Sequence, residues 1–181
     1  MSKKQLLLKA AEAKVRTGGY NNFSFRELAD EIGIKSSSVH YHFPTKADLG
    51  AELARQYTDS FLTNLGAPEA LIAEGKKPIE VYLQQFQCAL IEDKKMCLCG
   101  LLGAETDGLP DKVKAQTQRF FVQNIEWLTH AYMQDDGATE HTAKGQAIAA
   151  LSLLEGAMLV SKAMNDTAIF ATASAGLLAT R

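Results

Sequence analysis

The sequence predicts an all-α protein with two parts, an N-terminal three-helix helix-turn-helix domain and a C-terminal helical bundle. Three observations lead to this fold class: apolar residues recur at helical spacing through most of the 181 residues, helix-start signals precede several of these runs, and β-rich stretches are hard to find. The apolar share of 46% is ample for a buried core, and the modest glycine and proline content argues against disorder.

The first two helices are predicted from apolar spacing and from their ends. Residues 4–16 carry apolar side chains three and four positions apart, and Gly18 and Gly19 end that helix because glycine accepts left-handed backbone angles at little cost. Ser24 and Glu27 have the spacing of a capping box, in which each side chain bonds the backbone N–H of the other residue. A second helix is therefore expected to begin just after Ser24.

The second helix is predicted to stop at Gly33, and a third helix follows after only a few residues, near Ser36 or Ser37. Pro44 sets the end of the third helix, because proline disfavours helical backbone at the residue before it, Phe43. Two short helices joined by such a tight turn are typical of a helix-turn-helix, whose second helix enters the major groove of DNA.

The third helix lies in the stretch KSSSVHYHFPTKADL, residues 35–49, and is unusually polar. Val39 and Phe43 are four apart and are expected to hold the helix to the core, while His40, Tyr41 and His42 project outward. The three serines at its N-terminus are short hydroxyl donors at a place that favours a phosphate or a base edge.

Charge is distributed unevenly along the chain. Residues 1–46 hold eight Lys and Arg against four Asp and Glu, a balance of +4, whereas the remainder holds eleven against seventeen, a balance of −6. A basic head on an acidic body suggests that the head meets a polyanion.

Each polar residue of the third helix also has a simpler interpretation. Ser36 has the residue type and place of a helix cap, and Tyr41 can cover the neighbouring helix. His40 and His42 are two apart on a helix and face different sides, so a metal site is not predicted. The combination of spacing, caps and residue types is more specific than any single residue.

The stretch GGYNNFSFRELADEIGIKSSSVHYHFPTKADL resembles the DNA-binding domain of the TetR family of bacterial transcriptional regulators. The features that carry the resemblance are a glycine and an aromatic residue after the first helix, the Ser-Phe-Arg-Glu-Leu-Ala run, Gly33-Ile34, and residues 39–43 followed by a short polar step and Lys46. The match covers residues 5–50, and the sequence of the body matches only weakly.

The resemblance implies a two-fold dimer that binds a pseudo-palindromic operator, usually as a repressor, and a body whose bound ligand releases the DNA. It divides the chain into a DNA-binding domain at residues 1–46 and a ligand-binding and dimerisation domain at residues 47–181. By position, the resemblance assigns one set of residues to phosphate contacts. It assigns a second set to recognition-helix positions near base edges. The phosphate set is Ser24, Tyr41 and Lys46, and the recognition set is Lys35, Ser36, Ser37 and His40.

Further helices are predicted in the body. Thr45 and Asp48 form a second capping box that opens a long helix. The other signals are apolar spacing, Pro78, Pro110 and the turn DDGATE. The expected helices are residues 45–65, 78–95, 97–105, 111–133, 139–164 and 167–181.

The last two helices, about residues 139–181, are rich in alanine, glycine and serine, which let helices approach closely. The resemblance places a homodimer interface here, as a four-helix bundle formed by two chains. Ordinary packing within one chain is the alternative.

Aromatic and sulfur-containing side chains gather in the middle of the sequence. If they surround a cavity, the bundle would bind a mostly apolar small-molecule effector, and Tyr82, Phe86, Phe120 and Trp127 are the predicted lining residues. Aromatic stripes also build solid cores, so this alternative stays open.

Cys97 and Cys99 raise a separate question. A zinc site with His130 or His141 has poor spacing and no second cysteine pair. The two thiols can instead sense oxidants or electrophiles, with nearby lysines lowering a thiol pKa, or they can be inert core residues. An odd count of three cysteines without a secretory signal indicates a reduced, cytoplasmic chain.

Other classes of protein fit the sequence less well. It shows no nucleophile elbow, phosphate loop or metal-spaced His and Glu set, so an enzyme is not predicted, and no cofactor or metal is expected. The sequence shows no run of about 18 apolar residues, so a membrane span is not predicted. A helical small-molecule-binding adaptor without DNA binding would explain the body and leave the basic head unexplained.

Overall fold

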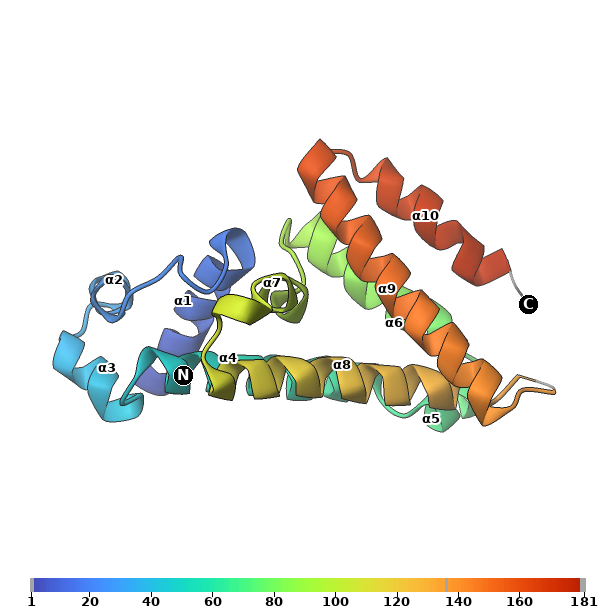
Figure 1. The fold of residues 1–181 in the computed structure, drawn as a ribbon, viewed down its shortest axis with the longest axis horizontal. Coiled ribbons are helices and arrows are strands. Elements are labelled where there is room, and N and C mark those ends of the chain that lie inside the picture. Colours follow the sequence, from blue (N-terminus) through green and yellow to red (C-terminus); the bar gives the residue numbers. More distant parts are fainter. Residues whose placement is uncertain (1, 136, 180–181) are drawn as a thin grey trace. The chain divides into compact units, whose positions relative to one another are not determined.

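The structure is a computed structural model that describes residues 2–135 and 137–179 (Figure 1). The chain is 80% helical, and the described residues contain no strand, which confirms the predicted all-α class. The α-helices are α1 (Lys3–Gly18), α2 (Phe25–Ile32), α3 (Ser36–His42), α4 (Lys46–Leu65), α5 (Pro68–Ala73), α6 (Pro78–Gln87), α7 (Leu98–Ala104), α8 (Asp111–Tyr132), α9 (Glu140–Met164) and α10 (Ala168–Ala179). A π-helical turn, η1 (Cys88–Glu92), and a 3-10 turn, η2 (Thr106–Gly108), complete the order.

The helices form two compact units. The head unit consists of Met1–Asp59 with Leu98–Phe120, and the body unit consists of Ser60–Cys97 with Phe121–Arg181. The division falls within α4 and α8, so each of these helices contributes to both units. The predicted domain boundary after residue 46 concerns which residues bind DNA, and it stays a prediction.

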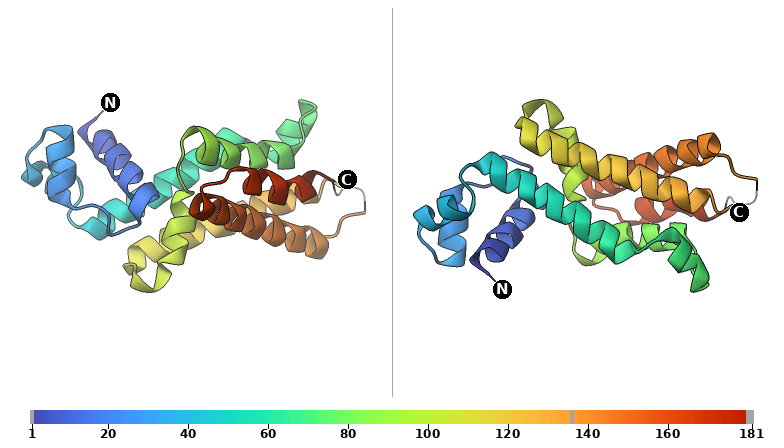
Figure 2. Two further views of the ribbon diagram at one scale, coloured as in Figure 1. Left: turned by 90° about the horizontal axis from the view of Figure 1, so that it is seen from above. Right: turned by 90° about the horizontal axis from the view of Figure 1, so that it is seen from below.

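In the head unit, α1, α2 and α3 contact one another, and α7 contacts α1 (Figure 2). Leu7, Leu28 and Val39, one from each of the three helices, have no exposed surface. These contacts bury the apolar face that each short helix presents, because helices of this length have little stability in isolation.

The ends of α2 confirm the sequence prediction. The Ser24 hydroxyl accepts a hydrogen bond from the Glu27 N–H at 3.2 Å, and the Glu27 carboxylate accepts one from the Ser24 N–H at 2.7 Å. Gly33 ends the helix in the left-handed conformation, with φ of 69° and ψ of 39°. The second predicted capping box is also present: Thr45 and Asp48 bond each other's backbone N–H at 3.1 Å.

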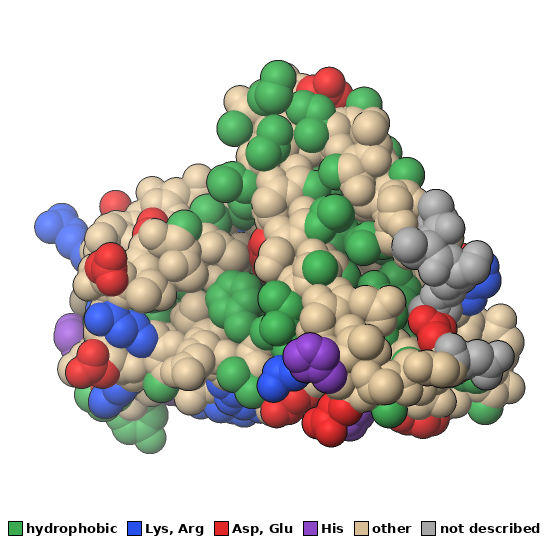
Figure 3. Space-filling model, turned by 45° about the vertical axis from the view of Figure 1, so that its right-hand side comes forward, with side chains coloured by type: hydrophobic (Ala, Val, Ile, Leu, Met, Phe, Trp, Pro, Cys, Tyr) green, Lys and Arg blue, Asp and Glu red, His purple; other side chains and the backbone are tan. Residues whose placement is uncertain are grey.

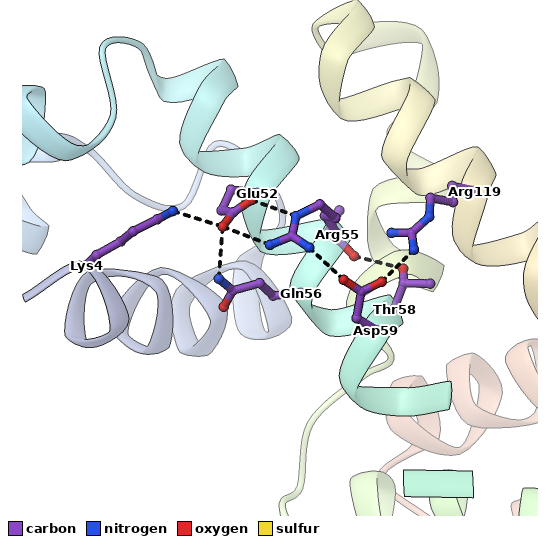
Figure 4. Close-up of polar contacts among 8 residues, drawn as sticks. Lys4, Glu52, Arg55, Gln56, Thr58, Asp59 and Arg119 are labelled. Carbon is purple, nitrogen blue, oxygen red and sulfur yellow. Dashed lines mark hydrogen bonds and ion pairs between the residues drawn. The ribbon is translucent and has the colours of Figure 1, made fainter. Parts of the chain in front are cut away.

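A chain of ion pairs joins α1, α4 and α8 within the head unit (Figure 4). Glu52 pairs with Lys4 at 3.0 Å and with Arg55 at 2.8 Å, and Asp59 pairs with Arg55 at 2.7 Å and with Arg119 at 2.5 Å. Hydrogen bonds from Arg55, followed by those from Lys4, lower the pKa of Glu52 to about 2. Because these side chains are partly exposed, each pair stabilises the unit modestly and mainly fixes the helices' register.

The loop after α1 is held by a residue far along the sequence. The Glu105 carboxylate, just after α7, accepts a hydrogen bond from the Tyr20 N–H at 2.8 Å. Gly19 has φ of 80° and ψ of −176°, a conformation that glycine alone adopts readily. A Cβ atom at this position would lie 1.8 Å from Glu105 Oε1.

In the body unit, α10 runs back alongside α9, and α6 contacts both helices (Figures 1 and 2). Asn165 ends α9 in the left-handed conformation, and the Asp166 carboxylate accepts from the Ala168 N–H at 2.9 Å at the start of α10. These two residues therefore make the predicted break between the last two helices.

The structure departs from the predicted helices at two places. The expected helix at 78–95 stops being α-helical after Gln87 and continues as the π-helical turn η1. The short helix α5 was not expected and begins at Pro68, whose fixed φ suits a first helical position.

The helix α9 is long and apolar enough to cross a membrane by length and composition, with a mean hydropathy of 1.5 over 18 residues. Helices in the cores and interfaces of soluble proteins have the same composition. This feature alone is therefore weak support for a membrane span.

Two glycine substitutions test the account of the α1 loop. We expect Gly19→Ala to lower the free energy of unfolding by about 2 kcal/mol, because alanine is strained at a positive φ and its Cβ displaces Glu105. Gly145→Ala, on the exposed side of α9 with open space around it, should raise that free energy by about 0.5 to 1 kcal/mol. Urea unfolding of both variants measures the difference, and equal midpoints would contradict the strain at Gly19.

Candidate functional sites

The helix α3 presents one buried face and one exposed face. Val39 has no exposed surface and Phe43 is 3% exposed, so these two side chains attach the helix to the head unit. Ser36, Ser37 and Tyr41 are exposed, as the sequence predicted for the outward face. Val39 is the one buried residue within the seven-residue helix, and Phe43 is its C-cap, so most of the helix surface is left for an external partner.

Among the residues that the structure describes, Tyr41 is the most exposed large hydrophobic residue, with 85% of its surface accessible. Its ring meets the His42 ring at a centroid distance of 5.2 Å. It does not cover a neighbouring helix, so the simpler interpretation of Tyr41 as a packing residue has no support. An exposed phenol in the last turn of α3, four positions after Ser37, suits a hydrogen bond to phosphate.

His40 is exposed but oriented. Its ring packs edge-on against Phe25 of α2 at 4.9 Å, and its Nδ1 lies 3.3 Å from the Pro44 carbonyl oxygen. A carbonyl oxygen can only accept, so Nδ1 carries the hydrogen in this contact. In the neutral ring, Nε2 is then an acceptor, which suits an exocyclic amino group on a base edge.

The basic residues Lys35 and Arg26 are exposed, and within the described part of the chain neither has an ion-pair partner. Lys35 occupies the N-cap position of α3, and Arg26 lies in the first turn of α2 near Ser24. Arg26 was not among the predicted contacts. Its signal in the sequence is a basic residue two positions after Ser24, a predicted phosphate ligand.

Lys46 points into the head unit. Its ammonium donates a hydrogen bond to the Phe23 carbonyl oxygen at 2.7 Å and lies over the rings of Phe23 and Tyr20, at 4.4 Å and 4.9 Å. Partial burial lowers the pKa of Lys46, while Glu27 and Glu105 act in the opposite direction. The predicted phosphate contact of Lys46 stays a prediction, and its side chain has a structural role in this conformation.

In the body unit, three of the four predicted effector residues form one aromatic cluster. Tyr82 lies 5.6 Å from Phe86 and 5.4 Å from Trp127, and Phe61 joins them at 5.6 Å from Tyr82. The fourth, Phe120, belongs to the head unit, where it contacts Tyr57. The aromatic cluster is defined here as Phe61, Tyr82, Phe86 and Trp127.

The polar atoms of the aromatic cluster have partners. The Tyr82 hydroxyl donates to the side-chain Oδ1 of Asn124 at 2.7 Å, and the Trp127 side-chain N–H donates to the Gly66 backbone carbonyl oxygen at 2.7 Å. Burial, followed by the charge of Glu155, raises the pKa of Tyr82 well above its ordinary value. These hydrogen bonds fix the ring positions, which is the arrangement of a packed core as much as of a pocket wall.

An open groove of about 600 Å³ lies along α6 and α10. It is lined by Gly75, Lys77, Glu80, Gln84, Gln87 and Leu178, among others. None of the predicted effector residues lines it.

Cys97 and Cys99 are buried, at 2% and 0% exposure. The Cys97 thiol forms a hydrogen bond with the Glu155 carboxyl, and this contact acts to lower the pKa of Glu155. Cys88 is only half-buried, but burial and Glu92 raise the pKa of its thiol. A sensing role for Cys97 and Cys99 stays a prediction that their surroundings do not favour. Among the described residues, no group of three His, Cys, Asp or Glu side chains is placed to hold a metal ion.

Glu155 is a second residue that the sequence reasoning missed, this time in the body unit. Its side chain is partly covered, but its Oε1 atom is fully buried and has no hydrogen-bond partner. Burial raises its pKa from 4.5 to about 7, and the Cys97 contact acts in the opposite direction. The available signal was composition, because Glu155 is the one acidic residue between positions 141 and 164.

Both parts of the chain match known proteins. Residues 7–53 match the family described as bacterial regulatory proteins, tetR family, and residues 79–175 match the C-terminal domain of LmrA/YxaF-like transcriptional regulators. The HTH-type transcriptional regulator LmrA of Bacillus subtilis (strain 168) is 23% identical over 170 residues, which cover 91% of this chain and 89% of that protein.

Solved structures agree over nearly the whole chain. A TetR transcriptional regulator from Legionella pneumophila is 28% identical, with a TM-score of 0.85 over 96% of this chain and 94% of that one. A TetR family regulator from Agrobacterium tumefaciens is 26% identical, with a TM-score of 0.81 over 97% of this chain and 95% of that one.

The buried carboxyl of Glu155 predicts a specific dependence of stability on pH. Because its pKa is raised in the folded chain, folding is favoured most below the ordinary value of 4.5, and this contribution is lost as the pH rises to about 7. We expect a loss of roughly 3 kcal/mol in the free energy of unfolding over that window. Glu155→Gln should remove this loss, and Glu140→Gln, at an exposed position of the same helix, should retain it. Urea unfolding at a series of pH values measures both, and parallel curves for wild type and Glu155→Gln would contradict the assignment.

Proposed function

Because this chain belongs to the TetR family of bacterial regulatory proteins, we propose that it is a cytoplasmic repressor that binds a pseudo-palindromic operator as a homodimer and leaves it when a small molecule binds the body. The chain is a DNA-binding transcriptional regulator of the helix-turn-helix type and not an enzyme. The observation that supports the proposal is the polar, exposed face of α3, which leaves Ser36, Ser37 and Tyr41 open to solvent while Val39 and Phe43 are buried beneath it.

The proposed contacts follow from exposure and chemistry. Ser24 and Tyr41 offer hydroxyl groups to phosphates, and Lys35, Ser36, Ser37 and His40 lie at the exposed start and outer face of α3, where base edges would be read. Arg26 adds an exposed positive charge two positions after Ser24. Phosphate contacts of this kind position the helix and make affinity depend steeply on salt.

The proposed dimer face lies on α9 and α10. Leu159, Val160 and Met164 are 56%, 45% and 67% exposed, although α9 is strongly apolar. Figure 3 shows hydrophobic side chains among uncharged surface where these helices reach the exterior. Ala147, Ala150 and Ala157 are buried within the chain, so the small residues of α9 also serve packing inside the body unit. Pairing α9 and α10 with their copies would cover the exposed side chains in a four-helix bundle.

The effector is proposed to bind in the body unit beside the aromatic cluster. Its large apolar rings supply contact area, and the few polar groups among them supply orientation. A mobility-shift titration of the purified protein against DNA upstream of its own gene tests the whole proposal. Specific binding that a compound reverses supports it, whereas a folded dimer that binds no palindromic upstream DNA contradicts it.

Two substitutions on α3 separate phosphate contacts from folding. Tyr41→Phe should lower operator affinity roughly tenfold, because a hydrogen bond to a charged oxygen is lost, and the unfolding midpoint should not change because the side chain is exposed. Lys35→Ala should reduce the steepness of log affinity plotted against log salt concentration by about one, the change expected when one phosphate contact is lost. Lys76→Ala, an exposed lysine of the body unit, is the matched control and should change neither quantity. Binding by Tyr41→Phe at wild-type affinity would remove Tyr41 from the interface.

A charge on the proposed dimer face should separate the chains. Leu159→Glu is expected to give a folded monomer, because a carboxylate at the centre of an apolar interface is not solvated. Ile72→Glu, at a 41% exposed position of α5, should remain a dimer. Sedimentation velocity distinguishes the two states, and a dimeric Leu159→Glu protein would place the interface elsewhere.

A further inference from the structure

One face of α9 meets the segment that precedes α7. Glu155 and Met158 are three apart, so they lie on the same side of the helix. The Cys97 N–H donates to the Met158 sulfur at 3.1 Å, and the Cys97 thiol forms a hydrogen bond with the Glu155 carboxyl. This double contact fixes the buried position of the carboxyl.

The carboxyl is incompletely satisfied. Glu155 Oε1 is buried and accepts no hydrogen bond, although a carboxylate can accept several. The titratable groups that face the Glu155 carboxyl are Tyr82, in α6, and Cys97, just before α7. Neither carries positive charge. Within the described residues, Glu155 has no ion-pair partner. A buried carboxylate without a cation is strongly destabilising, so the ionised form of Glu155 lacks a partner that a bound cation would supply.

The surroundings limit what could complete the site. Tyr82, whose pKa is raised in part by the charge of Glu155, belongs to the aromatic cluster. Its ring centroid lies 5.4 Å from that of Trp127. Aromatic faces attract cations and supply apolar contact area. A molecule with an ammonium group on an apolar body would pair its charge with the free carboxyl oxygen and pack its body on these rings.

We propose that the Glu155 carboxylate anchors the positively charged group of an amine-bearing, otherwise apolar effector in the body unit. This inference rests on the proposed function, because it names the chemical class of the molecule that releases the operator. The ammonium group supplies the donor that Oε1 lacks, and no bond is made or broken.

A pair of probes of matched shape tests the role of charge. 4-Phenylbutylamine carries an ammonium group at neutral pH, and 4-phenylbutan-1-ol has a hydroxyl group in the same place. Trp127 is the one tryptophan in the chain and belongs to the aromatic cluster, so its fluorescence reports binding directly and without DNA. Wild type, Glu155→Gln and the exposed control Glu140→Gln are titrated with both probes up to 1 mM.

For wild type and Glu140→Gln, we expect the amine to bind at least tenfold more tightly than the alcohol at pH 8. Only the ionised carboxyl pairs with the amine, and the pKa of Glu155 is raised to about 7, so amine affinity should rise about tenfold from pH 6 to pH 8. Glu155→Gln should bind both probes alike and show no such rise. Its thermal unfolding curve verifies that the variant is folded.

Equal binding of the two probes by wild type, an undiminished preference for the amine in Glu155→Gln, or no binding of the amine up to 1 mM would each overturn the proposal. The DNA titration of the same preparations is a separate measurement. Operator binding without amine selectivity contradicts only the role of Glu155, whereas amine selectivity without operator binding contradicts the proposed repressor function.

Discussion

The placement of α3 depends on the burial of Val39 and Phe43. A helix of seven residues has too few internal hydrogen bonds to persist alone, so these two side chains must hold it against α1 and α2. Because they occupy one face, serines, a histidine and a tyrosine can occupy the other without weakening the core. The same constraint explains why the segment looks too polar for a core helix and still has a defined position.

Local chemistry made most of the head predictable. The capping box of Ser24 and Glu27, the left-handed Gly33 and the stop before Pro44 involve residues within a few positions of one another, so the sequence displays them directly. Helices of the body were predictable for the same reason, from periodic apolar residues. The exceptions are the short helix α5 and the change to a π-helical turn at Cys88, for which the apolar spacing gave no signal.

Contacts between distant residues were not predictable. The hydrogen bond from Tyr20 to Glu105 spans 85 positions. Lys46 points inward to the Phe23 carbonyl oxygen and the rings of Phe23 and Tyr20, although its place at a helix start suggested a phosphate contact. Phe120 shares its residue type with the aromatic cluster but packs in the head unit. The role of Glu155 was not predictable for the same reason, because its Oε1 atom becomes buried only when the helices of the body unit pack together.

The central claim is that α3 reads DNA as one half of a two-fold pair. Selection of bound sequences from a random DNA pool by the purified protein tests it most directly, because no operator has to be assumed. The account predicts enrichment of an inverted repeat whose half-sites contact two major grooves of the duplex, with weaker enrichment as salt rises. Enrichment of a single unrepeated site, or no enrichment by a folded dimer, would contradict it.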